Sequence, residues 1–341
     1  MSPTTSKYLS MTDPERPRLG RNVFALAAVS LLTDVSSEMI YPLLPVFLTA
    51  VLGANASFIG AIEGAAETTA AMIKLASGWW SDRVRKRKPL VLLGYGIASF
   101  MRPLVAIAQS ATQVLFVRLA DRVGKGIRNA PRDALLADSV DVSIRGRAFG
   151  VQRSGDHMGG VLGPLIAYML LSRHWAEMRT VFWLAAIPGV LSVIVVMVFV
   201  KEVPRVQVLR SAQDDKLPGH PDTLPAHPDT LPLGAAFWRV MFVIFLFTLG
   251  NSTDAFLLLR ANQLGVPVAL APILWAALHV VKSASSIPGG ALSDRIGRRP
   301  TLIAGWILYA AVYYGFARAG VAWQAWALFG VYGIFFGLTE G

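Results

Sequence analysis

The sequence contains no cysteine, and only 16% of its residues are charged. Without cysteine the chain has no disulfide and no thiolate metal site, although this does not identify its compartment. Soluble domains carry roughly 25% charged residues, so the charge deficit argues against a soluble protein. The sequence also lacks HExxH, GxSxG, clustered histidines and an ATP-binding loop. It therefore predicts no enzyme, no metal site and no cofactor.

Long apolar runs dominate what is present. Hydrophobic residues make up 54% of the 341 residues, and the mean hydropathy is +0.51. Runs of roughly 17–25 residues, the length that crosses about 30 Å of hydrocarbon as a helix, recur along the chain. The sequence therefore predicts an all-α, polytopic membrane helical bundle in contact with the lipid bilayer. Ten apolar segments are predicted, at 22–50, 57–80, 90–109, 113–137, 148–171, 180–200, 237–262, 271–292, 301–318 and 322–341.

The net charge of +11 is distributed as a membrane topology requires. No basic arm interleaved with aromatic residues is present, so we expect no nucleic-acid partner. With the N-terminus in the cytoplasm, eighteen Lys and Arg residues fall in the N-terminal arm and the connections after even-numbered segments. The opposite connections carry only Arg173, Arg179 and Arg318. The positive-inside rule therefore predicts a cytoplasmic N-terminus in the plasma or inner membrane.

A polar, proline-rich stretch at 201–236 divides the chain into two parts. It contains the sequence HPDTLP twice, and such a composition cannot bury enough apolar surface to fold. We read it as a cytoplasmic linker, with a docking site as the alternative. The predicted organisation is an N-terminal arm (1–21), a six-helix bundle (22–200), the linker, and a four-helix bundle (237–341).

The two parts resemble each other in sequence. The stretch from Gly78 to Asp82 and Arg83 matches the stretch from Gly290 to Asp294 and Arg295. Counting back 25 residues from each first glycine reaches Gly53 and Gly265, each in the turn before an apolar segment. Equal spacing at two landmarks predicts an internal repeat, which recurs in transporter folds.

These loops resemble the motif Gly-x-x-x-Asp-(Arg/Lys)-x-Gly-(Arg/Lys)-(Arg/Lys) of the major facilitator superfamily. The second loop matches in full, whereas the first has Arg85 in place of the second glycine. Plain positive-inside loops would explain the arginines but not the repeated glycine-to-aspartate spacing. The resemblance implies that the loops stabilise one conformation of a transporter until its two halves rock. The residues concerned are Gly78, Asp82, Arg83, Lys86, Arg87, Gly290, Asp294, Arg295, Gly297, Arg298 and Arg299.

The resembled fold has two bundles of six helices, and the tenth predicted segment ends with the sequence at Gly341. About ten of twelve spans are therefore expected here. We expect either a fragment or a shortened gene product. A truncated, transport-inactive protein or a membrane scaffold is accordingly the alternative to a transporter, and an integral membrane enzyme is a further one.

The fifth segment contains Gly159, Gly163 and Pro164. This stretch partly resembles the Gly-x-x-x-Gly-Pro-x-x-Gly-Gly sequence of the family's proton antiporters, with Ala167 and Tyr168 replacing the last two glycines. The resemblance implies export by proton antiport. The alternative is helix packing, because small residues are common wherever membrane helices approach closely.

The fourth segment carries five cations, Arg118, Arg122, Lys125, Arg128 and Arg132. At 100° per residue they fall within an arc of roughly 120°, so one basic stripe can face a wet cavity. Asp121 lies inside the arc, spaced to pair with Arg118 or Lys125. Because Pro131 disfavours helix at the preceding residue, we expect 128–132 at or beyond the cytoplasmic edge.

Arg122, Lys125 and Gly126 also resemble the family's span-4 motif, an arginine followed by Gln-Gly, with lysine replacing glutamine. A register starting at Arg118 loses the glycine. In the family this arginine is linked to proton coupling. The alternative is a stripe that only pairs with acids on neighbouring spans.

Acidic partners are available within the other segments. Asp34 and Glu38 lie one turn apart, as do Glu63 and Glu67, and Asp254 lies in the seventh segment. Ionisable groups inside a membrane are functional candidates, although a mutually neutralised structural network is the alternative. Since spans 1, 4 and 7 line the cavity of the resembled fold, the predicted substrate or proton pathway comprises Asp34, Glu38, Arg118, Asp121, Arg122, Lys125 and Asp254.

We therefore predict a secondary transporter that moves a small-molecule substrate by alternating access. Coupling to protons or another ion is expected, and export is one possible direction. His157 and His279 stand alone on their segments and are expected to be packing residues rather than metal ligands.

Overall fold

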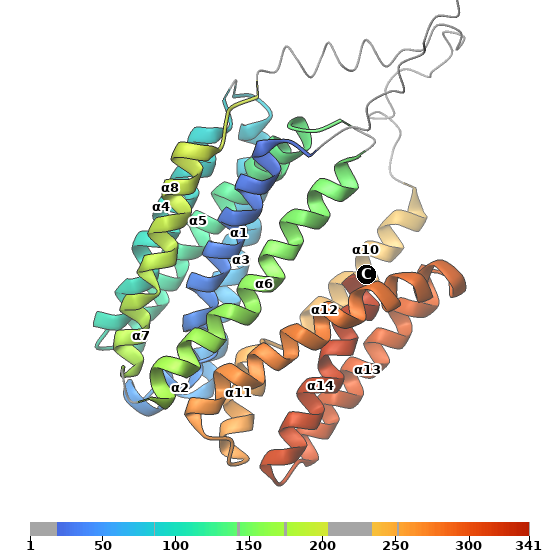
Figure 1. The fold of residues 1–341 in the computed structure, drawn as a ribbon. Coiled ribbons are helices and arrows are strands. Elements are labelled where there is room, and N and C mark those ends of the chain that lie inside the picture. The colour runs from blue at the N-terminus through green and yellow to red at the C-terminus, as the bar shows by residue number, and fades with distance from the viewer. Residues whose placement is uncertain are drawn as a thin grey trace, which may run out of the picture.

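The computed structural model describes residues 19–84, 86–141, 144–173, 176–203, 234–250 and 252–340, and every regular element among them is a helix. The first half of the chain runs from α1 to α8 (Figure 1). Its elements are α1 (Arg21–Ile40), α2 (Leu44–Val46), η1 (Phe47–Val51), α3 (Ala56–Ser81), α4 (Lys88–Met101), η2 (Arg102–Ile107), α5 (Ala111–Asp138), α6 (Arg145–Ser172), α7 (Met178–Leu184) and α8 (Ala186–Phe199).

The second half is built from fewer helices. Its elements are α10 (Ala235–Gly250), α11 (Asp254–Gln263), η5 (Val268–Leu270), α12 (Ala271–Ile296), α13 (Arg298–Arg318) and α14 (Ala322–Glu340). The seventh apolar segment, predicted as one helix, is instead two, α10 and α11. Ser252 and Thr253 lie between the two helices. The Thr253 hydroxyl caps α11 by accepting from the Ala255 N–H at 3.3 Å.

Six helical stretches of the described chain are long and apolar enough to cross a membrane. They are Arg21–Val51, Lys88–Ile107, Met178–Phe199, Val268–Ser286, Arg299–Arg318 and Ala322–Thr339. Helices α3, α5 and α6, with 26, 28 and 28 residues, are also long enough to span about 30 Å but carry more charge. The predicted all-α membrane fold is confirmed, and the count of ten spans stays a prediction.

The two turn glycines that mark the internal repeat share one backbone conformation. Gly53 has φ of 68° and Gly265 has φ of 96°, a region that residues with a side chain rarely adopt. Gly297, in the second loop motif, also has a positive φ, 93°. Its counterpart in the first loop, Arg85, lies outside the described residues. The glycines at these three positions are therefore set by the backbone.

Small residues bring α1 and α6 into backbone contact. A Cβ atom built on Gly155 would lie 2.4 Å from the Ala27 carbonyl oxygen. On Gly159 it would lie 2.7 Å from the Leu31 oxygen, and on Gly163 it would lie 2.7 Å from the Val35 oxygen. This stripe packs directly on the face of α1 that carries Asp34 and Glu38.

The two halves converge where α2 and α11 lie and diverge toward the ends at which α1 and α10 begin (Figure 1). Contact between the halves is close at two glycines. A Cβ on Gly60 would lie 2.9 Å from the Phe256 ring, and one on Gly160 would lie 2.6 Å from the His279 imidazole. The space that remains between the halves is described below.

Candidate functional site

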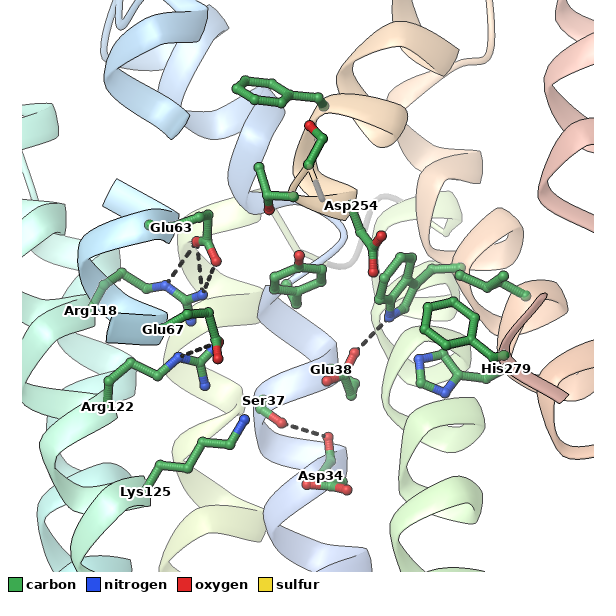
Figure 2. Close-up of a pocket in the computed structure, with 18 of the residues that line it drawn as sticks. Asp34, Ser37, Glu38, Glu63, Glu67, Arg118, Arg122, Lys125, Asp254 and His279 are labelled. Atoms are coloured by element: carbon green, nitrogen blue, oxygen red, sulfur yellow. Dashed lines mark hydrogen bonds and ion pairs between the residues drawn. The ribbon is translucent and has the colours of Figure 1, made fainter. Parts of the chain in front are cut away.

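A cavity of about 810 Å³ lies between the two halves of the chain. Its lining comes from α1, α3 and α5 of the first half, with Arg102 of η2, and from the α11 end, α12 and α14 of the second half. Figure 2 shows the charged side chains of the first half facing aromatic and polar groups of the second. Of the predicted pathway residues, those in the lining are Asp34, Glu38, Arg118, Arg122, Lys125 and Asp254.

Arg118 of α5 forms the most complete ion pair of the cavity, with Glu63 of α3. Its Nη2 donates to both carboxylate oxygens at 2.8 Å, and its Nε donates to Oε1 at 3.2 Å. Both residues are buried, with exposed fractions of 8% and 5%. A fully bonded, buried pair of this kind is very costly to break from one side.

Arg122 lies one turn further along α5 and contacts two carboxylates. Its Nε is 3.3 Å from Glu67 Oε1, an ion-pair contact without hydrogen-bond geometry, and its Nη1 is 3.7 Å from Asp121 Oδ2. The Glu67 side chain is 61% exposed, toward the cavity that it lines. This pair is therefore looser and wetter than the Arg118–Glu63 pair.

Asp121 is not in the cavity lining and does not pair as predicted. Its Oδ1 accepts from Arg102 Nε at 2.9 Å, and the Arg102 Nη1 donates to the Thr33 carbonyl at 2.9 Å. The expected pairing with Arg118 or Lys125 is therefore wrong, because Arg102 enters the same site from η2. Sequence reasoning missed Arg102. The available signal was an isolated arginine before Pro103, inside the apolar segment predicted at 90–109.

Lys125 and Arg128 also line the cavity, and neither lies within 4 Å of a carboxylate in the described part of the chain. Arg128 is 4% exposed, its Nε and Nη1 have no hydrogen-bond partner, and its guanidinium carbon lies 4.5 Å from the centroid of the Tyr95 ring. The expectation that 128–132 lie at or beyond the cytoplasmic edge stays a prediction. Helix α5 continues through Pro131, which places Arg128 against the cavity.

The carboxylates of α1 and α11 have different surroundings. Glu38 Oε2 accepts from the Trp275 indole N–H at 2.6 Å, a bond that joins the two halves. Asp254 Oδ1 accepts from the Tyr332 hydroxyl at 2.6 Å. Asp34 lines the cavity without a cation within 4 Å among the described residues. Asp34 therefore remains the lining carboxylate with the weakest fixed pairing in the first half.

Aromatic side chains form much of the opposite wall. Trp275 of α12 contacts His279, with ring centroids 5.3 Å apart, and packs on Tyr41 of the first half, which directly follows α1, at 5.0 Å. Phe335 and Phe336 of α14 complete this surface. His279 therefore lies in the cavity wall. In the described residues no group of three His, Cys, Asp or Glu side chains is arranged to hold a metal ion.

The first loop motif lies at the end of α3 and the start of α4. Asp82 ends α3 and is exposed, Lys86 is exposed, and the Arg83 guanidinium lies 3.6 Å from the Trp79 ring centroid. Arg87 pairs with Asp138, and the Arg87 N–H donates to Glu202 Oε1 at 2.8 Å. Gly78 packs against Ala130 of α5. The conformational role of these residues stays a prediction.

The second loop motif lies between α12 and α13. Arg295 and Arg299 are exposed, and Gly297 forms the turn between the helices. The structure does not describe the surroundings of Gly290, Asp294 and Arg298. Nothing in the structure tests the role predicted for this loop.

Comparison of the sequence with known proteins identifies a family. The model of the Major Facilitator Superfamily matches residues 26–341. An uncharacterized MFS-type transporter of Methanocaldococcus jannaschii is 34% identical over 95% of this chain and 79% of its own length. Multidrug resistance protein MdtG of Proteus mirabilis is 28% identical over 53% of this chain and 45% of its own.

The fold of a solved transporter is similar as well. A bacterial homologue of the human lysosomal transporter Spinster, in an inward-facing and occupied conformation, has a TM-score of 0.69 and 20% identity. The similarity covers 94% of this chain and 72% of that one. With the family model matched over most of its length, the chain belongs to the major facilitator superfamily and is a membrane transporter rather than an enzyme.

Proposed function

We propose that this protein moves a small solute across the cell membrane by alternating access, driven by protons or another ion. The observation that carries the proposal is the charged cavity of about 810 Å³ between two halves that converge at one end. A substrate site at the interface of two repeats, exposed to one side at a time as the halves rock, is how such transporters operate. The sequence contains no ATP-binding loop that could drive the cycle instead of an ion gradient.

Proton coupling is the finer part of the proposal, and Asp34 is the candidate carrier. An ionised carboxylate is costly to hold in a site that has closed to water, unless a cation or a proton neutralises it. Arg118 and Arg122 have their own carboxylates, and neither Lys125 nor Arg128 forms an ion pair with Asp34 within 4 Å, so no described cation directly neutralises Asp34. Proton uptake by Asp34 would lower the cost of closing the cavity, and release on the other side would restore the charge.

For the direction of transport, export in exchange for protons is one candidate. The name of the multidrug resistance protein MdtG supports it. The glycine stretch of α6 supports it less strongly, because Gly155, Gly159 and Gly163 have a packing role against α1 that any coupling scheme would need. The sign of the response to an imposed pH gradient distinguishes antiport from co-transport.

The orientation is also proposed: an N-terminus in the cytoplasm, as the distribution of positive charge favours. In that orientation the halves diverge toward the cytoplasm, and the described conformation is inward-facing. Single cysteines at Ser6 and Ser110 test this in a chain without native cysteine. Ser6→Cys should react with an impermeant thiol reagent only in inside-out vesicles, and Ser110→Cys only in intact cells.

A screen for compounds whose cellular accumulation depends on expression of the protein tests transport itself. The screen compares wild type with Asp34→Asn, in the presence and absence of a protonophore. Proton-coupled transport predicts a gradient-dependent change that Asp34→Asn removes. A change that persists in both conditions would assign the coupling elsewhere.

A further inference from the structure

We infer that Lys125 and Arg128 of α5 form a binding subsite for the anionic group of an amphipathic organic substrate, such as an aromatic carboxylate. This inference rests on the proposed transport function and names its substrate class. The evidence is the pairing of charges along α5, together with the composition of the facing wall.

The cations of the first half divide into two groups. Arg102, Arg118 and Arg122 each have a carboxylate within 4 Å, supplied by Asp121, Glu63 and Glu67. Lys125 and Arg128, the next two cations along α5, have none in the described part of the chain. Arg132, the last cation of the stripe, pairs with Asp133 at 2.8 Å. Buried charges are normally paired or bound by a ligand, so the middle of the stripe lacks the negative groups that lie at both of its ends.

Arg128 is held in place without being neutralised. It is 96% buried, lines the cavity, and leaves Nε and Nη1 without hydrogen-bond partners. The Tyr95 ring supports the guanidinium from behind, and α4 approaches closely here, since a Cβ on Gly94 would lie 2.6 Å from the Arg128 Cβ. A guanidinium fixed in this way matches a carboxylate or another planar oxyanion.

Lys125 reaches the same part of the cavity from one turn away. Figure 2 shows its side chain extending from α5 toward α1, which carries Asp34. Asp34 faces this pair and competes with a bound anion, whereas the nearby Glu67 is in ion-pair contact with Arg122. Glu38 and Asp254 accept hydrogen bonds from Trp275 and Tyr332 toward the second half. Removing the charge of Asp34 should therefore strengthen binding of an anion at Lys125 and Arg128.

The facing wall suits an apolar, planar body. Trp275, Phe335 and Phe336 line the cavity from the second half, and Tyr41 of the first half packs against Trp275. A cavity of this volume accommodates a drug-sized organic molecule. One wall supplies an oxyanion subsite and the other supplies aromatic contact, so the two together select molecules that carry both features.

Binding of 2-naphthoate to the purified protein in detergent, measured by equilibrium dialysis, tests the inference. The neutral 2-naphthamide and the cationic 2-naphthylmethylammonium are the matched ligands. We expect saturable binding of naphthoate with clear preference over both. Lys125→Gln and Arg128→Gln should each weaken naphthoate binding about tenfold, the effect of losing a charged hydrogen bond. Neither should change binding of the amide.

Three further variants extend the comparison. Arg21→Gln removes an exposed cation outside the cavity lining, where its guanidinium carbon lies 5.2 Å from the Phe199 ring centroid, and should leave naphthoate affinity unchanged. Asp34→Asn should increase it. Arg128→Lys keeps the charge and serves if Arg128→Gln fails to fold.

Equal binding of acid and amide, preference for the ammonium compound, or no saturable naphthoate binding at millimolar concentration would each overturn the subsite. None of these results bears on whether the protein transports, which the accumulation screen addresses independently.

Discussion

Arg118 and Arg122 lie four residues apart on α5, and the carboxylates that they contact, Glu63 and Glu67, lie four apart on α3. Residues spaced by four point to the same face of a helix, so two successive ion pairs connect α3 and α5. The two pairs differ in burial: Glu63 is 5% exposed, whereas the Glu67 side chain is 61% exposed. That difference predicts different costs for breaking them.

Arg118→Ala should destabilise the protein by about 3–5 kcal/mol, since it leaves the Glu63 carboxylate buried and unpaired. Arg122→Ala should cost clearly less, because water can reach Glu67. Thermal unfolding of the two purified variants measures the contrast. Adding Glu63→Gln to Arg118→Ala should recover part of the loss, whereas equal costs for the two single variants would contradict this assignment of burial.

Glu202 acts on one helix terminus. Its Oε1 accepts from the Arg87 N–H at 2.8 Å and its Oε2 accepts from the Lys88 N–H at 2.9 Å, at the start of α4. A carboxylate at a helix N-terminus satisfies unpaired donors and interacts favourably with the helix dipole. Glu202→Ala should therefore cost about 1 kcal/mol and speed amide hydrogen exchange in the first turn of α4. Unchanged exchange there would remove the capping role.

At the scale of elements, the contact between α1 and α6 depends on the absence of side chains. Gly159→Ala should destabilise the protein by about 1–3 kcal/mol, because the added methyl group meets the Leu31 oxygen and the Asp34 Cβ at 2.7 Å. It should also displace Asp34 and so reduce transport.

Gly150→Ala, in the same helix, is the matched control. No heavy atom lies within 4 Å of the position its methyl group would take, so the change should be neutral or slightly stabilising, as alanine favours helix over glycine. If both alanine variants unfold at the same temperature, the close approach of α1 and α6 is not a source of stability.

At the scale of the whole molecule, the Glu38–Trp275 bond joins the two halves. Trp275→Phe removes the indole donor but keeps an aromatic ring against Tyr41. We expect this variant to populate more of the conformation in which the halves separate at the α2–α11 end. Spin labels on cysteines at Ala50 and Gln263, both exposed near that end, would report a larger fraction of long distances. An unchanged distance distribution would show that this bond does not hold the halves together.

The sequence was sufficient to predict the helical membrane fold and the family, because apolar runs and spaced loop motifs are local patterns. The turn glycines Gly53 and Gly265 were found from spacing alone, and their positive φ explains why both positions hold glycine. The pairing of Asp121 was predicted wrongly because the partner, Arg102, comes from another helix. The break between α10 and α11 was missed because the apolar residues on both sides of the polar stretch 250–254 together have the length of one span. Partners across helices depend on packing that periodicity does not encode.

Four ion pairs lie in or directly behind the cavity wall, and all of them join residues of the first half: Arg102, Arg118 and Arg122 with Asp121, Glu63 and Glu67. Such a network travels with its own half as one rigid unit. When the halves rock, these charges keep their partners, and the cycle involves no exchange of salt bridges within that wall. The barrier between orientations should accordingly depend little on ionic strength and much more on whatever ligand bridges the charged wall to the aromatic one.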